Sequence, residues 1–132
     1  MSRELFTSWT DYQSAIDRLL ALAVKRIWIY DEDLGKLHLE TAERIELLMH
    51  PLASSRQDCL RIALRDTAPL QQRQPMVKRL LALHSHNSAA QQTPEQLGHL
   101  RDSMILVDDA HALIRFDRDQ PRCKLLIDEP EE

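Results

Sequence analysis

Acidic side chains follow two apolar runs of this 132-residue chain, at positions where they could hold a cation. Asp31, Glu32 and Asp33 come directly after the run 27–30, and Asp66 follows the run 59–65. In open α/β sheets, ligands bind beyond the carboxyl ends of strands, and carboxylate oxygens suit Mg²⁺. One hypothesis is therefore a Mg²⁺-dependent phosphoacceptor that uses Asp31 and Asp33. The competing interpretation is a solvated loop, because aspartate favours turns.

The other common catalytic patterns are incomplete. His84 and His86 could chelate a metal from an extended backbone, but no Cys, Asp or Glu stands beside them, and histidines at a helix end can satisfy terminal carbonyls. The chain has no G-x-S-x-G nucleophile elbow, and its two glycines, Gly35 and Gly98, cannot form a glycine-rich phosphate loop. The sequence predicts no catalytic residues, no metal and no cofactor.

Residues 101–116 contain two apolar runs joined by a short turn that opens with Asp108. This segment resembles the signature hairpin of the phospholipase D superfamily, which reads His-x-Lys, four residues, Asp, six residues, Gly-Ser. Matched on Asp108, the resemblance places Arg101 at the histidine position, Ser103 at the lysine position, and Arg115 with Phe116 at Gly-Ser. The family histidine is the phosphoryl-accepting nucleophile or acid, and arginine cannot replace it, because a guanidinium stays protonated.

The resemblance implies a catalytically degenerate half of a phospholipase D-like fold. It implies a vestigial anion-binding pocket formed by Arg101, Ser103 and Arg115, with Asp108 as a structural turn residue, and a non-catalytic role in binding or assembly. The rival within the same family is a phosphodiesterase or nuclease that uses His99 or His111. Most of the chain also looks like a small bacterial domain of unknown function, found alone or beside acetyltransferase domains.

The hydrophobic pattern predicts the elements that position these residues. Residues 12–23 repeat apolar side chains at helical spacing, with Thr10 and Gln13 as a capping box. The continuous run 27–30 is typical of a strand covered on both faces. Further helices are expected over 40–53, over 76–84 and from Thr93, and strands over 59–66, 103–107, 110–116 and 123–127, while 85–92 could hold a short strand or none. The prediction is an α/β fold, a mixed β-sheet flanked by helices, in one domain (1–128) with an acidic tail (129–132).

Composition and charge limit the kinds of partner that this chain is expected to bind. The chain is 43% hydrophobic and 29% charged with a net charge of −4, which argues against nucleic acid or an anionic membrane as partner. Cys59 and Cys123 lie in apolar runs and are expected to be buried, reduced thiols. The N-terminus lacks a signal peptide and no apolar run approaches the ~20 residues of a membrane span, so a cytoplasmic location is expected. Because full enzymes of the superfamily join two halves, the expected partner is a second copy or another protein.

Overall fold

The computed structural model describes residues 2–31, 34–52, 59–66, 68–92, 103–108, 110–117 and 120–127. In chain order the described elements are β1 (Ser2–Phe6), α1 (Trp9–Ala21), β2 (Ile27–Asp31), the short 3₁₀ helix η1 (Gly35–Leu37), α2 (Ala42–Leu52), β3 (Leu60–Leu64), α3 (Ala68–Arg73), α4 (Pro75–Leu83), β4 (Ser88–Gln92), β5 (Ser103–Val107), β6 (His111–Asp117) and β7 (Gln120–Ile127).

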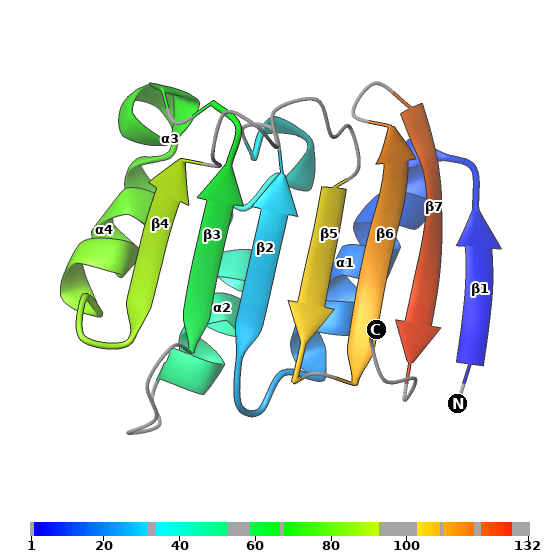
Figure 1. Ribbon diagram of the computed structural model, residues 1–132, viewed down its shortest axis with the longest axis horizontal. Coiled ribbons are helices and arrows are strands. Elements are labelled where there is room, and N and C mark those ends of the chain that lie inside the picture. Colours follow the sequence, from blue (N-terminus) through cyan, green and yellow to red (C-terminus); the bar gives the residue numbers. More distant parts are fainter. Residues whose placement is uncertain are drawn as a thin grey trace.

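The strands form a single mixed sheet in the order β1-β7-β6-β5-β2-β3-β4 (Figure 1). β2, β3 and β4 run parallel, as the helical connections between them require. β5, β6, β7 and β1 pair antiparallel, and β5 joins the two halves by pairing antiparallel with β2. The predicted α/β class, with a mixed sheet flanked by helices, is confirmed.

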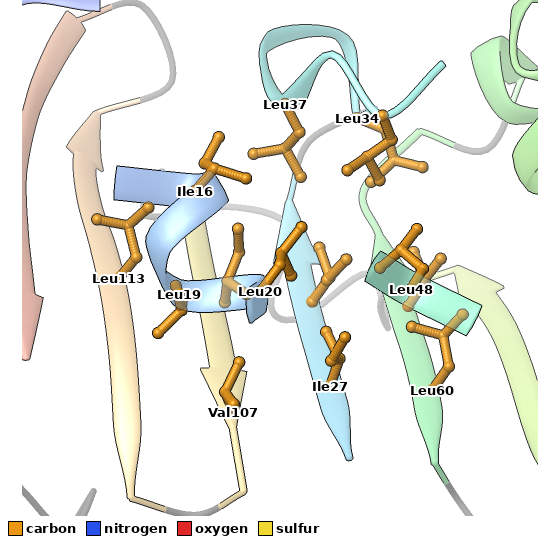
Figure 2. Close-up of a cluster of buried hydrophobic side chains, with 14 of the residues drawn as sticks. Ile16, Leu19, Leu20, Ile27, Leu34, Leu37, Leu48, Leu60, Val107 and Leu113 are labelled. Atoms are coloured by element: carbon orange, nitrogen blue, oxygen red, sulfur yellow. The ribbon is translucent and has the colours of Figure 1, made fainter. Parts of the chain in front are cut away.

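The helices cover only one face of this sheet. α1 lies behind β5 and β6, and α2 behind β2 and β3, while the face turned to the viewer carries no helix among the described residues (Figure 1). Strand side chains alternate between the two faces, so every second residue of β2, β3 and β5 packs under the helices. Ile27, Leu60, Val107 and Leu113 meet Leu19 and Leu48 in this core (Figure 2).

Several predicted boundaries differ from the structure. Helix α1 begins at Trp9 and is capped by Ser8, whose Oγ accepts from the Asp11 amide at 3.1 Å, rather than by Thr10. The edge strand β1 and the helix α3 were not predicted, and of the two alternatives left open for 85–92 the structure has the short strand, β4. The prediction that the run 27–30 is covered on both faces is wrong for the described part of the chain, since Trp28 and Tyr30 are only half-buried on the open face. The helix expected from Thr93 and the tail 129–132 lie outside the described residues.

Cys59 and Cys123 are both buried free thiols, as predicted. Among the described residues, no helix has the length and apolar character needed to cross a membrane.

Candidate functional site

Ser103 and Arg115, two residues of the predicted anion pocket, face each other across β5 and β6. The Arg115 Nη2 donates to Ser103 Oγ at 3.0 Å, and both side chains are buried. The negative charge beside them comes from the chain itself. Asp31, the last residue of β2, accepts a hydrogen bond from the Ser103 hydroxyl and lies 3.3 Å from Arg115 Nη2. A buried ion pair therefore stands where an external anion was predicted.

Aromatic rings from α1 cover this cluster. The Arg115 guanidinium lies 5.5 Å from the Trp9 ring centroid and 5.0 Å from that of Tyr12, distances at which a cation is attracted to a ring face. Burial raises the pKa of the Tyr12 hydroxyl above its ordinary value, and Arg115 opposes that shift. Burial likewise raises the pKa of Cys123, opposite Arg115 in the register, to about 11. At neutral pH neither group supplies a nucleophilic anion.

His111, another predicted site residue, does not join this cluster. Arg101, His99 and Asp33 lie outside the described residues. His111 pairs with Val107, four residues along β5 from Ser103, which places it roughly 13 Å away along the strand. Asp31 is fully engaged by Ser103, Arg115 and the Leu34 amide, 2.9 Å away, so a cation there would have to displace these donors. The described ranges contain no cluster of three metal-ligating side chains.

Asp108, predicted as a turn residue, reverses the chain between β5 and β6 with a left-handed φ of 55°. Its carboxylate also holds the connection between α1 and β2. Oδ1 accepts from the amides of Lys25 at 2.7 Å and Arg26 at 2.9 Å, and Oδ2 accepts from the Val24 amide at 2.9 Å. Partial burial would raise the pKa of Asp108, but these three donors and nearby His111 outweigh it, so its pKa is lowered.

The Asp108 contacts predict a pH-dependent stability. Because the pKa is lower in the folded protein, the stabilisation is complete above the ordinary aspartate pKa of about 3.9 and is lost as pH falls through the folded value. Asp108→Asn removes the charge and one acceptor, and we expect it to cost about 1–2 kcal/mol at pH 7. Urea unfolding at pH 7 and near pH 3 measures this. A difference between variant and wild type that does not shrink in acid would contradict the assignment.

The second candidate site is the open face of the sheet, which is apolar at its centre. Two rows of paired residues cross five strands from β2 to β1. One row is Trp28, Leu106, Ala112, Leu126 and Arg3; the other is Tyr30, Met104, Ile114, Lys124 and Leu5. Phe116 extends this surface on β6. Over β2, β3 and β5 the face is hollowed by about 260 Å³ between Trp28, Tyr30, Met104 and Leu106.

Cations surround these rings. The guanidinium carbons of Arg26 and Arg61 lie 5.5 and 5.6 Å from the Trp28 ring centroid. Arg65 lies 5.5 Å from the Tyr30 centroid and Arg122 5.7 Å from that of Phe116. Lys124 and Arg3 complete the set on β7 and β1. Among the strand residues of this face whose side chains the structure describes, none is an Asp or a Glu. Glu4 of β1 turns instead to the helical side, where it pairs with Arg18 of α1. The open face is therefore basic and aromatic.

Comparison with known proteins gives a fold relative but no family. No family model and no curated protein matches the chain. Among solved structures, the chain is similar to TrmBL2, an archaeal chromatin protein whose structure shows a novel mode of DNA binding, with a TM-score of 0.66 at 12% identity. The match covers 98% of this chain but only 46% of that one, so this chain spans less than half of TrmBL2. The resemblance to half a phospholipase D module is tested by none of these matches and stays a prediction.

Two predictions made from the sequence are overturned by this match. The expected non-catalytic phospholipase D-like role in binding or assembly is contradicted, because the solved structure that shares the fold belongs to a DNA-binding protein. The rival enzymes that use His99 or His111, or Asp31 with Asp33, are tested by none of these matches. The expectation that nucleic acid is an unlikely partner is contradicted on the same ground, while the expected second copy or protein partner is tested by none of these matches. The physical error lay in the net charge of −4, which averages the acidic connecting segments and the acidic C-terminal tail of the sequence with a basic sheet face. The similarity shows that this chain shares its fold with part of a chromatin protein.

Proposed function

We propose that this domain binds nucleic acid through the open face of its sheet. The observation that carries the proposal is the composition of that face, which combines aromatic rings with six cations and has no acidic side chain among its described strand residues. Single-stranded binding proteins use this combination, because cations follow the phosphates while bases stack on aromatic rings. The DNA binding of TrmBL2, which has a similar fold, supports the same class of ligand.

The buried cluster of Asp31, Ser103 and Arg115 has a structural role in this proposal. It ties β2, β5 and β6 together beneath α1 and so fixes the strands that carry Trp28, Tyr30 and Phe116 on the opposite face. The cytoplasmic location is proposed along with the function, since two buried reduced thiols fit a reducing compartment.

Amide NMR during titration with a short oligonucleotide tests the proposal. We expect the shifts to concentrate on β2, β3, β5 and β6, and the indole N–H of Trp28 to move while that of Trp9, on the helical side, stays in place. Trp9 contacts Arg115 within the core, so it serves as an internal control. Shifts confined to α1 and α2, or no shifts at low salt, would rule out the open face as the binding surface.

A further inference from the structure

The hollow in the open face is placed to receive a single flat ring. Its volume of about 260 Å³ lies just below the ~300 Å³ at which small-molecule sites begin, which suits one planar group rather than a whole cofactor. Trp28, Met104 and Leu106 offer apolar walls, while Gln91 on β4 and Arg61 on β3 add an amide and a guanidinium at the rim. A nucleobase is bound by a surface on which it can stack and by hydrogen-bond partners at its edge, and this hollow offers both.

We infer that this hollow binds an unpaired nucleobase, and that the domain therefore prefers single-stranded nucleic acid to duplex. This inference rests on the proposed function and specifies its ligand. In a duplex the bases are stacked on one another, and only phosphates and groove edges reach a flat protein surface. In a single strand a base can leave the stack and lie on an aromatic ring or a guanidinium plane. The Trp28 ring, with Arg61 beside it at 5.6 Å, provides both kinds of platform.

The charges around the hollow favour the same ligand. Arg65 lies beside Tyr30, which lines the hollow, and Lys124 lies on β7, two strands beyond Met104, so both cations belong to the same sheet face as the hollow. A strand that inserts a base at Trp28 can lay its phosphates over these groups. At the base edge Gln91 can donate and accept hydrogen bonds and Arg61 can donate them, without a fixed pattern, because both side chains are exposed. Weak sequence preference follows from this arrangement, since stacking is available to every base.

The test compares strands of about 12 nucleotides, within the range that one such surface covers, as DNA, as RNA and as the DNA duplex of the same sequence. In a Trp9→Phe protein, which leaves Trp28 as the only tryptophan, single strands are expected to quench the fluorescence on stacking. Affinity for the single strand is expected to exceed that for the duplex by about ten-fold or more. Anisotropy with the wild-type chain gives the same affinities independently of the Trp9 substitution.

Two substitutions of Trp28 separate stacking from apolar packing. Trp28→Leu keeps an apolar side chain on the strand but has no ring, and it is expected to weaken single-strand binding about ten-fold and to abolish the preference over duplex. Trp28→Phe keeps a ring and is expected to retain most of both. Equal binding of duplex and single strand without quenching overturns this inference while leaving the proposed function intact. Failure to bind any of the three nucleic acids overturns the proposed function itself. The relative affinities of the DNA and RNA strands show which of the two sources supplies the base.

Discussion

Replacing Arg115 with methionine is expected to lower the free energy of unfolding by about 3–5 kcal/mol. Asp31 has 1% of its surface exposed, and the substitution removes the guanidinium that lies 3.3 Å from its carboxylate. Among the residues that the structure describes, the Ser103 hydroxyl and the Leu34 amide would still donate to that carboxylate. A buried charge that loses its partner still bears the full free-energy cost of its removal from water. Breaking such a pair therefore destabilises the protein by more than the intact pair stabilises it. Urea unfolding measures the loss.

Two controls make this result specific to the buried pair. In the double variant Asp31→Leu/Arg115→Met both charges are absent, and most of the lost stability is expected to return, because apolar replacement of a buried pair is often neutral. Arg18→Met breaks the exposed pair with Glu4, where 49% and 39% of the two side chains are accessible, and should cost no more than about 1 kcal/mol. A cost at Arg115 equal to that at Arg18 would contradict the structural role of the cluster.

The fold class was predictable because three of its strands are apolar runs of the right length. β2 is apolar up to Asp31, β5 is apolar after Ser103, and β3 is interrupted only by Arg61, while the turn at Asp108 marks the hairpin that follows β5. β4 could be predicted only as one of two alternatives, since Ser88–Gln92 has only small and polar side chains and is held at the sheet edge by backbone pairing with β3. β1 was missed for the same reason, because Arg3 and Glu4 interrupt its apolar pattern and β7 supplies its pairing.

The candidate sites were predictable only in part. The spacing of the hairpin correctly associated Ser103 with Arg115, since residues twelve apart on two paired strands meet in register. Asp31 was missed as their partner because the contact depends on β5 lying beside β2, which joins residues 72 positions apart. The open face was missed because a run such as Ile27–Tyr30 looks the same whether one or both faces of its strand are covered. Net charge concealed the basic surface, since it carries no information on where charges lie.

Neutralising three cations of the open face is expected to weaken nucleic-acid binding about a hundred-fold at 0.1 M salt. The variant is Arg61→Gln/Arg122→Gln/Lys124→Gln, in which glutamine keeps a polar side chain of similar reach without the charge. Each phosphate contact releases about 0.7 of a counterion from a single strand, so the loss of three contacts removes about two logarithmic units of affinity at that salt. Two of the three side chains are exposed and the third is half-buried, so the fold is expected to remain intact.

A matched variant removes the same charge from α3 and α4 instead of from the open face. Arg73→Gln/Lys78→Gln/Arg79→Gln neutralises three exposed cations on α3 and α4, and its net charge equals that of the open-face variant. Any effect of overall charge on binding is therefore shared by the two proteins, while an effect of position is not.

The most direct measurement is the affinity of wild type and both triple variants for one labelled single-stranded oligonucleotide, followed by anisotropy across a salt series. We expect the open-face variant to lose about a hundred-fold in affinity and about two units of salt slope, and the α3–α4 variant to bind as wild type does within a few-fold. Equal losses in the two variants, or binding too weak to detect for wild type at low salt, would contradict a nucleic-acid interface on the open sheet.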